Sequence, residues 1–437
     1  MFSRRNPRPK TPDVLKAWEL LDSDDVPGAL RQLRSDTDSL PLGEVALVVA
    51  RAAEAAGFDD LRQAASELAA RPALAKAQYA YGYACVERGV SYLAVPALRE
   101  VLRANPDALG VMRELVSAYE REGRHADAAE LLGRYEDRFV PWPDRYLLVY
   151  NALMAGDLTL ARRQHALLGD PEDAQWLPPR RRQTRMLERA AATTTPLDLA
   201  DLRGWQYVIG GTILGTLSPY GFEAGMTGRF AFLQDTPEQC LRGLLRLRTL
   251  SAAAGLRPRS VSLLPDRDSR ILGLAAARVL GLPAKPFAPG REHTVVVAYD
   301  LNGLLDTPEG PEILQQLHER APGQVLHEHA SCWTDAPAVT ADSVTLLHQS
   351  VVAPWGERMA VCEDGTPRRG PADERPEERI AEEIAAAEAV ADEGDGGTPA
   401  DPDETFAGFA SAVRDTWLRG ERTALRSSGP VPSGRFL

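Results

Sequence analysis

The chain has 437 residues and a formal net charge of −12, from 50 basic and 62 acidic side chains. One hydrophobic core rarely serves a chain of this length, so we expect two or three structural units. The acidic balance argues against nucleic acid as a partner, because binding phosphates needs a concentrated basic surface. The sequence has no CxxC pair, no signal-peptide pattern and no apolar run long enough for a bilayer. We therefore expect a cytoplasmic protein without membrane contact.

Glycine and alanine recur with a constant period in the first third of the chain. Gly89 and Gly123 are 34 residues apart, as are Ala94 and Ala128, and the next equivalents follow at 33. Glycine ends a helix in the left-handed conformation without a Cβ penalty. The period and these positions resemble the tetratricopeptide repeat. We therefore expect residues 11–168 to form a stack of helical hairpins.

The resemblance implies a curved helical solenoid with a concave groove. Such a groove binds a protein or a peptide, and a protein partner held by residues 11–168 is the leading expectation for this region. The alternative is a scaffold that packs only on the rest of its own chain. Resemblance of fold does not identify the partner.

Residues 169–198 are rich in proline, arginine and threonine, which predicts a linker with one short helix. Beyond it, short apolar runs alternate with amphipathic stretches, as is typical of a mainly parallel sheet covered by helices. We therefore predict a multidomain protein in which an all-α solenoid is followed by an α/β domain at 199–362. Its clearest strands are expected at 261–264, 294–299, 325–330 and 344–348, with helices at 270–280 and 312–320.

The expected strand ends define a candidate ligand site. In parallel sheets, ligands bind outside the carboxyl ends of the strands, close to where the strand order reverses. The ligand-binding candidates chosen on this ground are Asp266, Arg267, Asp268, Ser269, Asp300, Asn302, His329 and Gln349.

Residues 261–283, VSLLPDRDSRILGLAAARVLGLP, resemble the opening strand, loop and helix of type I phosphoribosyltransferases. The resemblance implies pyrophosphate at a helix N-terminus and a Mg²⁺ cofactor. Residues 294–300, TVVVAYD, resemble the family's strand that ends in two acids, but Tyr299 replaces one of them. Leu304 and Leu305 stand where small residues hold the 5-phosphate. We therefore predict a degenerate domain that lacks catalysis and keeps a site for a small phosphate-containing ligand.

His327 and His329 alternate on one predicted strand, so their imidazoles share a face. Together with Cys332 or His348 they form a weak candidate site for zinc or iron. The alternative is a set of polar residues at a strand end that bond to neighbouring loops.

The composition changes after residue 362. Residues 363–437 are rich in acidic residues, proline and glycine, and we expect a mostly flexible extension. Within it, Phe406, Phe409, Val413 and Trp417 share one face of a short helix. This face is either a docking element for a partner or the packing face of a helix on its own domain, and the pattern does not decide between them.

The leading hypothesis is therefore a protein-binding scaffold or adaptor with a non-catalytic α/β domain. The first alternative is an active phosphoribosyltransferase-like or nucleotide-processing enzyme that uses Mg²⁺, with Asp300 and the 266–269 loop at the substrate. The second is a metal-dependent hydrolase built on His327, His329 and Asp300.

Overall fold

The computed structural model describes residues 8–218, 225–335, 339–361, 365–389 and 399–422, together with residues 392, 394, 427 and 429–433. The chain divides into two compact units, Met1–Leu177 and Pro178–Leu437, here called the helical unit and the α/β unit. The division falls inside the predicted linker. Residues of that linker form a short turn, η3 (Ala174–Trp176), and a 16-residue helix, α11 (Leu177–Ala192).

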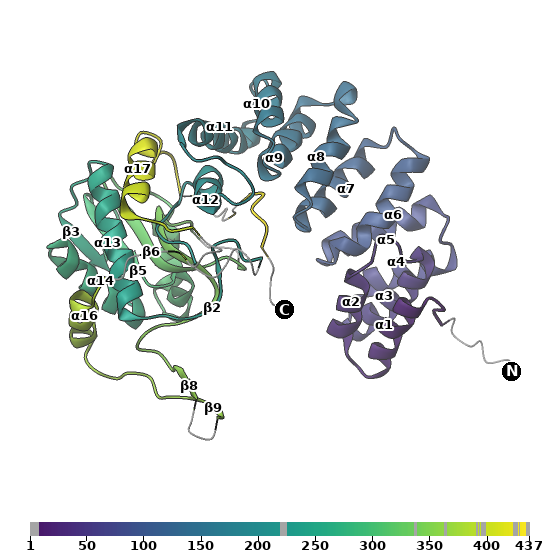
Figure 1. The fold of residues 1–437 in the computed structure, drawn as a ribbon. Coiled ribbons are helices and arrows are strands. Elements are labelled where there is room, and N and C mark those ends of the chain that lie inside the picture. Colours follow the sequence, from purple (N-terminus) through teal and green to yellow (C-terminus); the bar gives the residue numbers. More distant parts are fainter. Residues whose placement is uncertain are drawn as a thin grey trace. The chain divides into compact units, whose positions relative to one another are not determined.

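The helical unit is a row of five helical hairpins in which each hairpin packs on the next (Figure 1). Two short turns, η1 (Glu136–Arg138) and η2 (Pro141–Arg145), separate the fourth hairpin from the fifth. The expected all-helical N-terminal part is confirmed. The hairpins are α1 (Pro12–Asp22) with α2 (Val26–Arg34), α3 (Leu42–Ala56) with α4 (Asp59–Ala70), α5 (Ala75–Glu87) with α6 (Ser91–Ala104), α7 (Leu109–Arg121) with α8 (His125–Gly133), and α9 (Tyr146–Met154) with α10 (Leu158–Leu167).

Small residues allow the helices of a hairpin to turn and to approach. Gly89 and Gly123 follow the first helices of their hairpins with φ of 76° and 67°, in the left-handed region that favours glycine. A Cβ on Gly82 would lie 2.6 Å from Cγ of Leu98, so α5 and α6 are too close there for any side chain. Ala94 is fully buried in the same contact region. Gly89 and Gly123 of the period thus allow the chain to turn after a helix, whereas Gly82 and Ala94 allow the two helices to approach.

The core of the α/β unit is a seven-stranded sheet in which every pair of neighbours is parallel. Its strands are β1 (Ile213–Leu214), β2 (Phe230–Gln234), β3 (Ser260–Leu263), β4 (Ala284–Pro286), β5 (Thr294–Ala298), β6 (Val325–Cys332) and β7 (Ser343–Val352). The order is β1-β7-β6-β5-β3-β4, and β2 also pairs with β7. This confirms the predicted α/β class with a mainly parallel sheet. A separate antiparallel pair is formed by β8 (Met359–Val361) and β9 (Pro367–Arg369).

The strand order reverses between β3 and β5. The chain runs from β3 outward to the edge strand β4 and returns to β5 on the opposite side of β3. The helices that connect or cover the strands are α12 (Leu202–Gly210), α13 (Pro237–Ala253), α14 (Arg267–Leu280), the turn η4 (Leu301–Asp306) and α15 (Gly310–Leu317). Helix α14 packs on β3 and β5, and α13 packs beside α14. The residues after β3 and β5 therefore occupy the position where ligands bind in such sheets.

The C-terminal extension belongs to the α/β core. Helix α16 (Glu377–Ala386) packs on α14, and α17 (Asp403–Val413) packs on α13 (Figure 1). Phe406, Phe409, Val413 and Trp417 are each at most 4% exposed, so in this structure the apolar face packs on its own domain, which is one of the two readings that the sequence left open. Helical spacing indicates an apolar face, but the residues that cover this face are distant in the sequence. Of the predicted flexible extension at 363–437, residues 363–364, 390–391, 393, 395–398, 423–426, 428 and 434–437 lie outside the described residues.

Two buried carboxylates tie the extension to the sheet. Both oxygens of Asp401 accept from the Arg203 guanidinium, at 2.9 and 2.7 Å. The guanidinium groups of Arg203 and Arg246 both lie over the ring of Phe406, at 5.2 and 4.7 Å from its centroid. Oδ2 of Asp342 accepts at 2.7 Å from Arg422 of the extension, and Arg320 pairs with Oδ1. The extension is therefore attached to the rest of the α/β unit by paired buried charges in addition to apolar packing.

Candidate functional site

The predicted loop after β3 forms the first turn of α14. Oδ2 of Asp266 caps the helix by accepting from the Ser269 amide at 2.9 Å. Asp268 accepts at 2.6 Å from the indole Nε1 of Trp355, and Arg267 donates to two backbone carbonyls after β9. Burial raises the pKa of Asp266. The positive end of the helix dipole is therefore met by carboxylates of its own turn.

Two predicted residues, His348 and Asn302, contact Asp300, which follows β5. Its Oδ2 lies 3.6 Å from Nε2 of the buried His348 in β7, and its Oδ1 accepts from the Asn302 amide at 2.8 Å. Cys332 shares the face of His348, because the two are register partners in β6 and β7. The Cys332 thiol is 3.7 Å from the carbonyl oxygen of Gln349. Asp300, His348 and Cys332 therefore lie near the same face of the sheet, whereas Gln349 takes part only through its backbone carbonyl.

The weak metal site predicted on β6 is not assembled. His327 and His329 point to one face of the sheet, whereas Cys332 and His348 point to the opposite face. The imidazole of His327 bonds to two hydroxyl groups of β7, at 3.1 and 3.3 Å. Burial, with a smaller contribution from His329, lowers the pKa of His327 to about 3. His327 is thus a neutral side chain held by hydroxyl groups of the neighbouring strand β7, and not by loops as the alternative interpretation expected.

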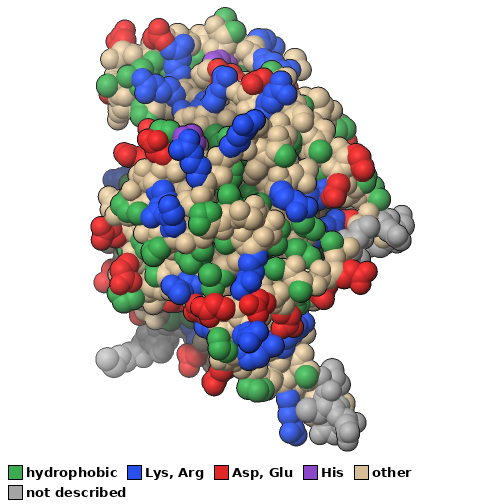
Figure 2. Space-filling model, turned by 90° about the vertical axis from the view of Figure 1, so that its left-hand side faces the viewer, with side chains coloured by type: hydrophobic (Ala, Val, Ile, Leu, Met, Phe, Trp, Pro, Cys, Tyr) green, Lys and Arg blue, Asp and Glu red, His purple; other side chains and the backbone are tan. Residues whose placement is uncertain are grey.

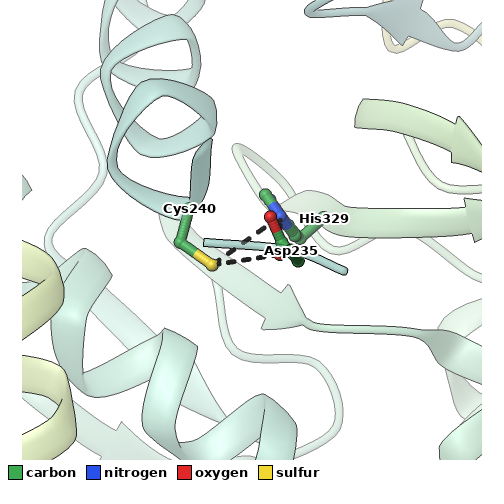
Figure 3. Close-up of side chains that lie close together, drawn as sticks. All are labelled: Asp235, Cys240 and His329. Atoms are coloured by element: carbon green, nitrogen blue, oxygen red, sulfur yellow. Dashed lines mark hydrogen bonds and ion pairs between the residues drawn. The ribbon is translucent and has the colours of Figure 1, made fainter. Parts of the chain in front are cut away.

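His329 meets two residues that were not predicted, Asp235 and Cys240 (Figure 3). Asp235 follows β2 directly, and Cys240 is the fourth residue of α13. Nε2 of His329 lies 2.9 Å from Oδ2 of Asp235 and 3.8 Å from Sγ of Cys240. The thiol lies 3.3 Å from the same carboxylate oxygen. All three side chains are fully buried, so their donor atoms converge in a space closed to solvent.

The same carboxylate oxygen also accepts from the Tyr299 hydroxyl, at 3.0 Å. Burial, reinforced by the charge of Asp235, raises the pKa of Cys240 and of Tyr299 well above their usual values. Both groups are therefore protonated and donate to Asp235. Nδ1 of His329 has no hydrogen-bond partner among the described residues and lies 3.0 Å from where a Cβ on Gly243 would stand.

This geometry is not that of a nucleophilic cysteine. In a Cys–His–Asp arrangement the thiol and the carboxylate meet different nitrogens of the imidazole, so that the proton can pass between them. Here Asp235 and Cys240 both approach Nε2 of His329. Nitrogen, oxygen and sulfur donors around one point are instead the donor set that a transition-metal cation prefers.

Local sequence gave one signal for this cluster. Thr236 and Pro237 begin α13, and such a helix start directly after a strand places Asp235 at a strand end. His329 is 94 residues away from Asp235. Asp235 and His329 come into contact because β2 and β6 both pair with β7. The sequence pattern did not predict this strand order.

A second candidate surface lies on the helical unit. Tyr79 and Tyr83 are one turn apart on α5 with ring centroids 6.4 Å apart, and Tyr83 is 46% exposed. Glu87 is exposed one turn further along α5, and Glu114 of α7 lies beside Tyr79 and Glu87. Burial and the Glu87 charge raise the pKa of Glu114. We call these four residues the α5–α7 patch.

Cations near the α5–α7 patch have other partners. Arg113 forms a two-pronged ion pair with the buried Asp144, at 2.7 and 3.0 Å. Arg121 donates to the carbonyl oxygen of Val86 at 2.7 Å. Within the described residues, neither Glu87 nor Glu114 has a salt bridge. The patch thus combines two aromatic rings with two carboxylates that have no salt bridge within the described residues, although the charge of Arg121 acts on Glu114.

Family models, curated proteins and solved structures yielded no match to this chain. Among the described residues, no helix is both long and apolar enough to cross a membrane.

Proposed function

We propose that this protein is a binding scaffold whose helical unit, which resembles a tetratricopeptide array, holds a partner segment rich in lysine and arginine. The α5–α7 patch is the proposed contact surface. The observation that carries the proposal is the tyrosine pair, of which Tyr83 is exposed and Tyr79 is partly buried, beside two carboxylates that have no salt bridge within the described residues.

A basic segment fits this surface for two physical reasons. A cation over an exposed tyrosine ring gains about 0.5–1 kcal/mol. A cation between Glu87 and Glu114 would also relieve the repulsion that contributes to the raised pKa of Glu114. A neutral or acidic segment offers neither gain and would leave both carboxylates without a counter-charge.

The charge distribution supports a protein partner in preference to nucleic acid. On the face of the molecule drawn in Figure 2, Lys and Arg side chains are interspersed with Asp and Glu. The net charge of −12 points the same way, since a polyanion needs a concentrated basic surface.

Peptide display on the immobilised full chain tests this proposal. We expect the enriched peptides to carry several lysines or arginines. In fluorescence anisotropy, an enriched peptide should bind the Glu87→Gln/Glu114→Gln variant about tenfold more weakly, because charge pairs across an interface are lost. Enrichment of acidic peptides would contradict the proposal.

A matched control is available on α4. Glu67 is exposed and lies outside the α5–α7 patch, so Glu67→Gln removes one charge without touching the proposed contact. Peptide affinity should be unchanged in this variant. Equal weakening by Glu67→Gln and by the double variant would indicate a general charge effect. The α5–α7 patch would then not be the contact surface.

For the α/β unit we propose a non-catalytic role, in a domain that resembles a degenerate phosphoribosyltransferase. The support is the first turn of α14, where Asp266 and Asp268 occupy the helix N-terminus that would otherwise attract pyrophosphate. Calorimetric titration of the full chain with phosphoribosyl pyrophosphate and Mg²⁺ should give no saturable heat. Saturable heat that is lost in Asp300→Ala would favour the enzyme alternative.

A further inference from the structure

We propose that Asp235, Cys240 and His329 bind a divalent transition-metal cation of the zinc class. This site is independent of the peptide-binding function. It differs from the metal site suggested by the sequence, because it takes one residue each from the end of β2, the start of α13 and the middle of β6.

The spacing of the donor atoms matches a tetrahedral site. Metal–ligand distances of about 2.0–2.3 Å place tetrahedral ligand atoms about 3.3–3.6 Å apart. The observed separations are 2.9 Å for nitrogen to oxygen, 3.3 Å for sulfur to oxygen and 3.8 Å for nitrogen to sulfur. Shifts of a few tenths of an ångström bring all three to these values. The Tyr299 hydroxyl, 3.0 Å from the same carboxylate oxygen, would be the fourth donor.

A cation would replace the hydrogen bonds that His329 and Cys240 make to Asp235. In the structure one oxygen of Asp235 accepts from three side chains, while Nδ1 of His329 is buried without a hydrogen-bond partner among the described residues. A bound divalent cation would make Cys240 a thiolate and release its proton. His329 would coordinate through Nε2 and carry its proton on Nδ1.

The full burial of the ligands indicates a structural site. Structural zinc sites are closed by protein ligands, whereas catalytic sites keep an open position for water. The ion would join the start of α13 to β6. Because the donors lie in a closed interior, we expect the ion to enter during folding.

Metal analysis of the full chain, purified without a metal-affinity tag, tests the site. Inductively coupled plasma mass spectrometry should find about one equivalent of zinc per chain, either as purified or after refolding with Zn²⁺. X-ray absorption at the zinc edge should show one sulfur at about 2.3 Å, with nitrogen and oxygen ligands at about 2.0–2.1 Å. Less than about a tenth of an equivalent after refolding, or a first shell without sulfur, would overturn the proposal.

Two cysteine variants locate the metal. Cys240→Ser should lose the bound zinc, whereas Cys332→Ser should retain it, because Cys332 is a buried thiol on the opposite face of the same sheet. Equal zinc content in the two variants would place the metal elsewhere and overturn the assignment. If Cys240→Ser fails to fold, the absorption spectrum of the unchanged protein still decides whether sulfur is a ligand.

Discussion

The two units differ in where most of their charged side chains lie, although the helical unit also buries one carboxylate, Asp144, in an ion pair with Arg113. In the helical unit, apolar and small residues fill the core, while the unpaired carboxylates of the α5–α7 patch lie at the surface. In the α/β unit, oppositely charged side chains are buried as pairs, such as Asp401 with Arg203 and Asp342 with Arg422. Polar substitutions should therefore change binding in the first unit and stability in the second.

The largest stability effect is expected for Asp342→Asn. This carboxylate is 4% exposed and pairs with Arg320 and Arg422, so its removal leaves two buried guanidinium groups without a counter-charge. We expect a loss of about 3–5 kcal/mol in the unfolding free energy of the α/β unit. Differential scanning calorimetry should show a lower transition for this unit and an unchanged one for the helical unit.

The exposed Asp415 provides the control for that change. Asp415→Asn removes the same charge from a side chain that is 83% exposed, so the transition should move little. Similar shifts for both variants would mean that net charge, and not buried pairing, stabilises the α/β unit.

The Asp342 carboxylate should also make the stability of the α/β unit depend on pH. Burial opposes its ionisation, but the guanidinium groups of Arg422 and Arg320 hold the pKa of Asp342 below its usual value. The unfolded chain therefore takes up this proton first as the pH falls. The stabilisation is complete above about pH 4 and is lost as the pH falls through the folded-state pKa. The difference in melting temperature between the unchanged protein and Asp342→Asn should narrow from pH 6 to about pH 3; a constant difference would contradict this account.

Two glycines of the helical unit are expected to respond in opposite directions. Gly82→Ala places a Cβ 2.6 Å from the buried Leu98 and should cost about 1–3 kcal/mol through overpacking. Gly110→Ala on α7 meets nothing within 4 Å and should gain up to about 1 kcal/mol from helix propensity. Both are measured as shifts of the helical-unit transition. Equal shifts would show that the close approach of α5 and α6 at Gly82 does not require a glycine.

The smallest stability effect is expected at the α5–α7 patch. Glu114→Gln removes a carboxylate whose folded-state pKa is raised, so the ionised form slightly destabilises the fold and its removal should not reduce stability at neutral pH. We expect a change within about 0.5 kcal/mol, as for other surface substitutions. A larger loss would show that Glu114 supports the helix packing and would weaken its assignment to binding.

The sequence predicted those features that depend on neighbours along the chain. The spacing of Gly89 and Gly123 is local, and it led to the helical hairpins. Continuous apolar runs led to the parallel strands β3, β5, β6 and β7. The edge strand β4 was missed because it has three residues and ends in a proline.

The features that were missed depend on contacts across the fold. The face of Phe406 was recognised, but not that Arg203 and Arg246 would cover its ring. Likewise, His329 was chosen as a polar residue at a strand end, while Asp235 and Cys240 were not associated with it. Such pairings follow from the strand order, which local periodicity does not specify.

Hydrogen–deuterium exchange of the full chain, with and without an enriched basic peptide, tests the central claim most directly. The account predicts slower exchange in α5 and α7 on peptide binding, with little change in the α/β unit. Protection that is confined to the α/β unit, or peptide binding without protection of α5, would contradict the assignment of binding to the helical unit.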